Sequence, residues 1–213
     1  MRIAIPIFPG FAATDAIGPY EILSRLPGAE LRFVAVQAGP VATDTGFMQV
    51  LADPLVAMAD PDLIVVPGAP NRNLPLEDDI LLEWLRTAHE GSTWTTSVCT
   101  GSHLLGAAGI LRGRRATTHW SDKEALPGYG ATPCEERVVF DGKIVTAAGV
   151  TAGYDMALAL AARIAGDDFA KAVQLALEDD PQPPFDAGSP ERAPPHLVAL
   201  VRKLGLGATR SLP

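Results

Sequence analysis

The hydrophobic positions of the chain follow two alternating patterns. Short apolar runs rich in Val and Ile, bounded by Gly or Pro, are typical of buried strands, whereas apolar residues spaced three and four apart indicate helices. Because the two patterns alternate along most of the chain, they predict a doubly wound, mostly parallel α/β sheet flanked by helices. We expect strands at about residues 2–8, 31–37, 63–66, 93–98, 137–140 and 143–147, and helices at about 15–26, 76–89, 101–110, 151–165 and 167–177.

Two segments depart from this alternation. Asp141-Gly142 separates two strand-like runs and predicts a β-hairpin with a type I′ turn in the second half of the chain. Residues 180–195 read DPQPPFDAGSPERAPP, which is too rich in Pro for regular structure, so we expect an ordered, extended strap across the surface. The chain has 213 residues, 47% of them hydrophobic, and residues 1–213 are expected to form a single α/β domain.

Charge and cysteine content narrow the classes of function. The net charge is −8 and the Lys and Arg residues are scattered, which argues against a nucleic-acid partner because phosphate binding requires a concentrated basic surface. The chain has no long apolar run, and its start is read as a buried strand, so neither a membrane partner nor a targeting segment is expected. Cys99 and Cys134 form neither a disulfide framework nor a metal-binding motif. We therefore expect a cytoplasmic protein without a metal.

The segment TTSVCTGS, residues 95–102, places Cys99 between a buried strand and a helix rich in Gly and Ala. This order predicts a nucleophile elbow, in which the nucleophile lies on a tight turn with small neighbours. The helix that begins at Gly101 directs N–H groups and the positive end of its dipole at the sulfur, so we expect a thiolate near neutral pH. A buried structural cysteine is the simpler interpretation of Cys99 alone, but its neighbours favour the elbow.

A second loop is expected at the carboxyl edge of the sheet, where ligands bind in wound sheets. Pro67-Gly68-Ala69-Pro70 follows a buried strand, and Gly68 permits a close approach of the backbone. The N–H group of Gly68 or Ala69, together with that of Thr100, is a candidate for binding an anion or a developing negative charge.

The loop at residues 11–19 opens the first helix with Asp15. An N-cap role for Asp15 or Thr14 is the simpler local interpretation. At the carboxyl edge, however, the loop would bring a carboxyl group beside Cys99, where a neighbouring negative charge would raise its pKa and suit it to carrying protons. His119 is interpreted as a hydrogen-bonded structural residue rather than as a partner of the cysteine.

The segment SVCTGSHLLGAAGILRGRRATTHW, residues 97–120, resembles the nucleophile segment of the ThiJ/PfpI, or class I glutamine amidotransferase-like, superfamily, which has a flavodoxin-like fold. The resemblance covers residues 2–195 and is strongest to the isonitrile hydratases of that superfamily. It also rests on IPIFPGFAATDAIGPYEIL, DLIVVPGAP, TAAGVTAGYDMALALAARIAG and QLALEDDPQPPFDAGSP.

The resemblance implies a catalytic role for three residues: Cys99 as nucleophile, Asp15 as acid/base carboxylate and Thr100 as the neighbour that shapes the site. The positions expected to bind substrate or an oxyanion are Gly68, Ala69 and Val150. The implied reaction is that of a lyase: it adds water to an isonitrile and gives an N-substituted formamide through a thioimidate on the cysteine, with no cofactor. A homodimer that binds a small-molecule substrate is implied as well.

Thr100 stands where many proteases and amidotransferases of the superfamily carry a His directly after the Cys, which disfavours a peptidase or amidase. Two alternatives stay open. One is a non-catalytic small-molecule-binding protein related to the sensor domain of AraC-type regulators, and the other is a glyoxalase-like or deglycase-like cysteine activity on the same scaffold.

Overall fold

The computed structural model describes residues 1–70 and 73–204 of the chain. Its main sheet has eight strands: β1 (Arg2–Pro6), β2 (Glu30–Ala35), β3 (Gly39–Ala42), β4 (Gln49–Pro54), β5 (Leu63–Val66), β6 (Trp94–Val98), β9 (Val138–Asp141) and β10 (Ile144–Ala147). They lie in the order β3-β4-β2-β1-β5-β6-β10-β9. The pairs β3–β4 and β9–β10 at the two edges are antiparallel, and all other neighbours are parallel.

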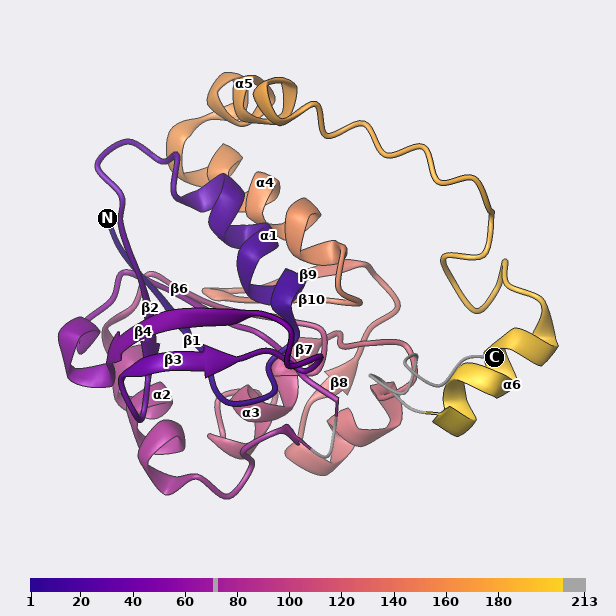
Figure 1. The fold of residues 1–213 in the computed structure, drawn as a ribbon, viewed down its shortest axis with the longest axis horizontal. Helices are drawn as coiled ribbons and strands as arrows, with labels where there is room; N and C mark the ends of the chain where they lie inside the picture. The colour runs from indigo at the N-terminus through magenta and orange to yellow at the C-terminus, as the bar shows by residue number, and fades with distance from the viewer. Residues whose placement is uncertain (71–72, 205–213) are drawn as a thin grey trace.

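Helices cover both faces of this sheet (Figure 1). On one face, α1 (Ala13–Leu23) packs against α4 (Ala152–Ala165), which in turn contacts α5 (Asp167–Leu177). On the other face lie α2 (Asp79–Gly91) and α3 (Gly101–Ala107). All four residues of β5 are fully buried, because a central strand covered on both faces has no exposed side. The predicted doubly wound fold is confirmed.

Smaller elements connect these layers. They are the 3-10 helices η1 (Leu55–Met58) and η3 (Lys123–Tyr129), the two-stranded ladder of β7 (Arg115–Ala116) with β8 (Thr132–Pro133), and the C-terminal helix α6 (Pro195–Leu204). Neither α6 nor the β3–β4 hairpin follows from the sequence analysis. The hairpin carries exposed apolar side chains, Phe47 and Leu51 among them, so its pattern lacks the alternation that marks a half-buried strand.

The predicted hairpin of the second half is formed by β9 and β10, but its turn differs from the prediction. Asp141 pairs with Ile144, so the two loop residues are Gly142 and Lys143 rather than Asp141 and Gly142. Gly142 has φ +61°, and Lys143 has no positive φ. A type I′ turn needs positive φ at both loop residues, whereas positive φ at the first alone is the feature of a type II′ turn.

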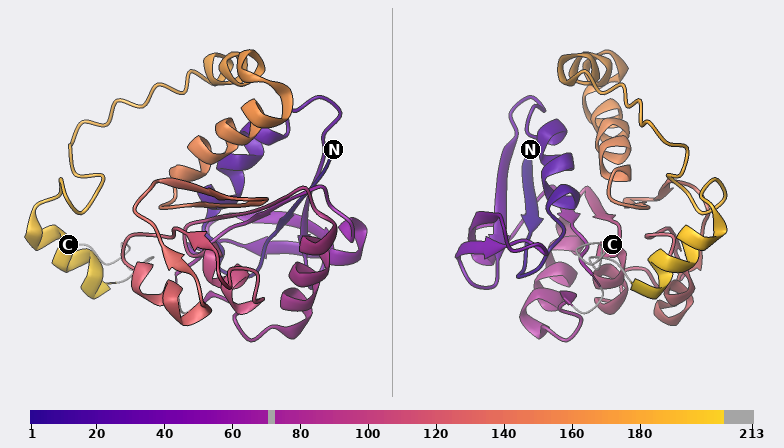
Figure 2. Two further views of the ribbon diagram at one scale, coloured as in Figure 1. Left: turned by 180° about the vertical axis from the view of Figure 1, so that it is seen from behind. Right: turned by 45° about the vertical axis from the view of Figure 1, so that its right-hand side comes forward.

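The Pro-rich strap runs from the end of α5 to α6 in a long arc that stands out from the sheet (Figures 1 and 2). Between Glu178, which ends α5 in a left-handed conformation, and Pro195, it contains neither helix nor strand. Residues 181–188 are exposed, while Ser189 and Pro190 are half-buried.

Within the described ranges, no helix is both long enough and apolar enough to cross a membrane.

Candidate active site

Cys99 lies on the sharp turn between β6 and α3, as an elbow requires. Its φ of +57° is in the left-handed region, which costs a non-glycine residue about 1–3 kcal/mol and persists only where the surroundings impose it. Here the Cys99 N–H donates to the carbonyl oxygen of Ala147 at 3.1 Å. Its carbonyl oxygen accepts from Oγ1 of Thr118 at 2.9 Å. These bonds, from two neighbouring segments, hold the strained turn in place.

Two glycines allow the loop after β5 to approach the elbow. A Cβ atom at Gly101 would lie 2.2 Å from the carbonyl oxygen of Val66, so only Gly can begin α3 at this point. A Cβ atom at Gly68 would lie 2.6 Å from Oγ1 of Thr100. The same hydroxyl donates to the carbonyl oxygen of Ala69 at 2.6 Å and accepts from its N–H at 3.0 Å. The elbow and the loop are thus locked together by close packing.

Asp15 lies in the first turn of α1 and is fully buried. It does not cap the helix, because the N-cap residue is Ala12 and no side chain accepts a capping hydrogen bond there. Instead, Oδ2 of Asp15 accepts from the Gly68 N–H at 2.9 Å, and the carboxylate interacts with the thiol of Cys99. The capping interpretation of Asp15 or Thr14 is therefore wrong, and the two acidic groups lie together as expected.

The environment of Asp15 raises its pKa from 3.8 to about 7. Burial is the largest cause, since it disfavours the charged form, and the negative charge of Asp44 adds to it. The hydrogen bonds from Gly68 and from the Cys99 thiol act in the opposite direction. A carboxyl group that titrates near pH 7 can both accept and release a proton at neutral pH.

Burial also raises the pKa of the Cys99 thiol well above its ordinary value, and the charge of Asp15 raises it further. The N–H of Thr100 lowers this pKa, in the direction expected for the start of a helix, but its effect is smaller than that of burial. The expectation of a thiolate near neutral pH is therefore wrong for this closed site. The sulfur needs a base, and Asp15 lies beside it.

The positions expected to bind substrate have other partners in this structure. The N–H groups of Gly68 and Ala69 are engaged by Asp15 and Thr100, and Val150 is half-buried in the loop before α4. Their roles toward a substrate or an oxyanion stay predictions.

Two aspartates that the sequence does not mark as site residues, Asp44 and Asp122, also influence the pKa values of the active-site groups. Asp44 follows β3, and Asp122 precedes η3; both raise the pKa of an active-site acid by their negative charge. Asp122 lies in a small cluster in which Oγ of Ser121 bonds to both Asp122 and Nδ1 of His119. His119 thus has hydrogen-bonded partners of its own, in agreement with a structural role. No spacing in the sequence marks these contacts, which depend on loop packing.

Both cysteines are free and buried. Among the described residues, no three His, Cys, Asp or Glu side chains are grouped as metal ligands.

Comparison with known proteins identifies relatives along the whole fold. Isonitrile hydratase from Pseudomonas putida is 42% identical over 206 residues, which are 95% of this chain and 89% of that protein. The HTH-type transcriptional regulator CdhR from Pseudomonas aeruginosa is 33% identical over 77% of this chain, but the match spans only 51% of the regulator. The crystal structure of a ThiJ/PfpI family protein from Pseudomonas syringae is 36% identical, with a TM-score of 0.91 over 98% of this chain and 89% of that one. The DJ-1/PfpI family pattern matches residues 1–163, and the chain therefore belongs to this family.

Proposed function

We propose that this protein adds water to an isonitrile and releases an N-substituted formamide, with Cys99 as the nucleophile and Asp15 as the proton carrier. One observation carries the proposal: a carboxyl group with a pKa of about 7 interacts with a thiol held on a strained elbow. The similarity to isonitrile hydratase from Pseudomonas putida, over 95% of the chain, supports the same chemistry. A small-molecule substrate, a cytoplasmic location, a homodimer and the absence of a nucleic-acid partner are parts of the proposal that rest on the sequence.

In the first half of the reaction, ionised Asp15 accepts the thiol proton while the sulfur bonds to the terminal carbon of the isonitrile. The proton is then transferred from Asp15 to that carbon, which gives the thioimidate R–N=CH–S–Cys99. The N–H of Thr100 stabilises negative charge on the sulfur during attack. The isonitrile group is linear and narrow, so it suits a sulfur whose residue is only 2% exposed.

In the second half, Asp15 accepts a proton from a water molecule whose oxygen bonds to the thioimidate carbon, and the nitrogen takes up that proton. The adduct is R–NH–CH(OH)–S–Cys99. Its C–S bond then breaks, the hydroxyl proton returns to the sulfur through Asp15, and R–NH–CHO is released. Water and isonitrile are consumed, and both side chains return to their starting protonation states.

The test is conversion of benzyl isonitrile to N-benzylformamide by the purified protein, followed by chromatography. We expect turnover by the wild type, none by Cys99→Ala and nearly normal turnover by the matched control Cys134→Ala. Mass spectrometry of the wild type during turnover should detect the thioimidate on the peptide that contains Cys99. Formamide production by Cys99→Ala at the wild-type rate would rule out the covalent mechanism.

A ligand-binding role without turnover is the second candidate, favoured by the similarity to the regulator CdhR. It predicts that an isonitrile or another small molecule binds to the protein unchanged. Calorimetric binding of benzyl isonitrile to the wild type, with no formamide formed over many hours, would favour this candidate over the hydratase.

A further inference from the structure

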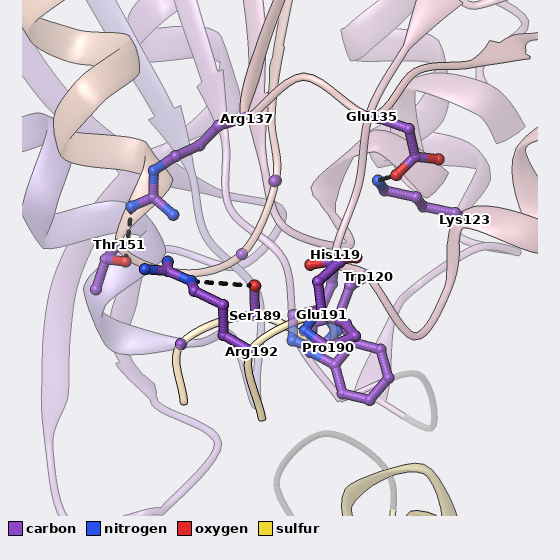
Figure 3. A pocket seen from close by; sticks show the side chains of 13 residues that line it. His119, Trp120, Lys123, Glu135, Arg137, Thr151, Ser189, Pro190, Glu191 and Arg192 are labelled. Atoms are coloured by element: carbon purple, nitrogen blue, oxygen red, sulfur yellow. Dashed lines mark hydrogen bonds and ion pairs between the residues drawn. The ribbon is translucent and has the colours of Figure 1, made fainter. Parts of the chain in front are cut away.

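A cavity of about 550 Å³ lies between the loop after Thr118, the loop before α4 and the end of the strap. Three segments far apart in the sequence form its walls: residues 119–123, residues 135–151 and the end of the strap at residues 188–192 (Figure 3). Its size lies within the range of small-molecule sites. The strap contributes Gly188-Ser189-Pro190, the end of the segment QLALEDDPQPPFDAGSP that carries part of the family resemblance.

The cavity is continuous with residues that hold the elbow. Thr118, which donates to the carbonyl oxygen of Cys99, directly precedes His119 in the cavity wall. On the other side, Ala147 accepts from the Cys99 N–H and directly precedes the wall residues Ala148 and Gly149. The cavity wall therefore continues directly from two residues that hydrogen-bond to Cys99.

Gly149 and His119 lie close together in this wall. A Cβ atom at Gly149 would lie 3.5 Å from the His119 ring, so the two residues are in contact distance of each other. Asp122, which bonds to Ser121 next to the ring, is close enough to Cys99 for its charge to raise the pKa of the thiol. A charge in the loop that carries the wall residues Trp120 and Lys123 thus acts on the sulfur.

Three cationic side chains line the cavity of this otherwise acidic protein. In Figure 3, the guanidinium groups of Arg137 and Arg192 both point toward Thr151, one from the segment before β9 and the other from the strap. Arg137 forms an ion pair with Asp155 and donates from its second terminal nitrogen to Oγ1 of Thr151 at 2.9 Å, and Arg192 forms an ion pair with Asp186 at 2.8 Å. Two guanidinium groups with nearby hydroxyls match the planar geometry of a carboxylate.

The rest of the wall contributes an aromatic surface and a third cation. Trp120 is half-buried, and its ring is tilted against His119 with a centroid distance of 5.5 Å. The side chain of Lys123 is only 19% exposed, and its partner Glu135 is 87% exposed, so the ammonium group is the more enclosed of the two. The cavity therefore combines ion-paired cationic side chains with a flat aromatic wall.

We infer that this cavity binds the substituent of the substrate, and that the preferred substrates are isonitriles with an aromatic ring and a carboxylate group. The ring packs against Trp120, the carboxylate is bound by Arg137 and Arg192, and the isonitrile group points past Gly149 toward Cys99. The inference rests on the proposed hydratase function and adds the substrate class. It assigns the end of the strap a role in specificity.

The test compares 4-(isocyanomethyl)benzoate with its methyl ester, which has the same ring and isonitrile group but no charge. We expect the wild type to convert the acid with a kcat/KM at least about tenfold above that of the ester, since hydrogen bonds to charged groups are among the stronger ones. In Arg192→Gln the ratio of acid to ester should fall close to one. The matched control Arg86→Gln, on α2 and paired with Glu83, should keep the wild-type ratio.

Binding to the Cys99→Ser variant, measured by calorimetry, tests the cavity without turnover. The acid should bind at least about tenfold more tightly than the ester, and adding Arg192→Gln should remove that difference. Equal values for acid and ester, or a preference retained in Arg192→Gln, would overturn the inference. Conversion of neutral benzyl isonitrile reports on the hydratase proposal separately, so failure of one is distinguishable from failure of the other.

Discussion

The elbow and the cavity differ in how they are built. On the elbow side, Cys99 and Asp15 are almost completely buried and are held by main-chain hydrogen bonds and glycine contacts of strands and helices. On the cavity side, the charged groups lie on loops and the strap, and Arg137 and Arg192 remain about half exposed or more. The first region is buried and closely packed, whereas the second is charged and partly exposed.

This difference separates the reaction from recognition. Burial makes Asp15 titrate near neutral pH, which is useful for proton transfer but destabilises its charged form. Loops that carry half-exposed cations can change with little effect on the core, so they suit the selection of a substrate. Changes on the elbow side should therefore alter the rate of reaction and the stability, while changes on the cavity side should alter the choice of substrate.

After the complete loss of turnover in Cys99→Ala, the largest expected effect is the fall in turnover of Asp15→Asn. The amide keeps an acceptor for the Gly68 N–H but cannot accept a proton, so kcat should fall by about 100-fold. In the wild type, kcat should rise with pH through about 7 as Asp15 ionises, and this rise should be absent in the variant. Rates measured from pH 5 to 9 with benzyl isonitrile provide the check, and an unchanged profile would remove Asp15 from the mechanism.

Gly101→Ala tests the rigidity of the elbow. The added Cβ atom would meet the carbonyl oxygen of Val66 at 2.2 Å, so α3 has to shift, and the free energy of unfolding should fall by about 1–3 kcal/mol. Turnover should fall as well, because the thiol moves with the turn. Gly91→Ala, where a Cβ atom meets nothing within 4 Å, is the matched control and should leave both quantities nearly unchanged. Equal denaturation midpoints for the two variants in urea would contradict the packing argument.

Asp15→Asn should also change how stability depends on pH. Because the folded-state pKa of about 7 is above the ordinary 3.8, the folded wild type binds more protons than the unfolded chain between these values. Its stability should therefore fall as the pH rises from about 4 to about 7 and then level off. The variant should lack this fall and be more stable than the wild type at pH 8, by on the order of 2–4 kcal/mol. Urea denaturation at pH 4 and pH 8 measures the difference; parallel curves would indicate that Asp15 titrates normally.

The smallest expected effect is on the reactivity of Cys99. The negative charge of Asp15 raises the pKa of the thiol, so Asp15→Asn should lower that pKa and speed alkylation by iodoacetamide several-fold at pH 8. Cys134 in the same sample provides an internal reference, since its own alkylation should not respond to the change. Mass spectrometry of the two cysteine-containing peptides over time gives both rates, and a constant ratio between variant and wild type would count against the coupling.

The sequence by itself determined most of the order of strands and helices, though not the β3–β4 hairpin or α6, together with the position of the second hairpin and the elbow at Cys99 with Asp15 and Gly68 as neighbours. These features are encoded locally: periodicity marks the elements, and small residues mark the points where backbones approach closely. The parallel arrangement then brings the carboxyl ends of the strands together, so residues at those ends can be expected to meet.

Only the tertiary structure decided the protonation of the site and the existence of the cavity. The helix start predicts an ionised thiol, but the pKa of a buried group depends on the desolvation imposed by every surrounding segment, and here that effect is the larger. The cavity joins residues 119–123 to strap residues 188–192, which are far apart in the sequence. No local pattern encodes such a contact, because it depends on the path of loops that carry no periodicity.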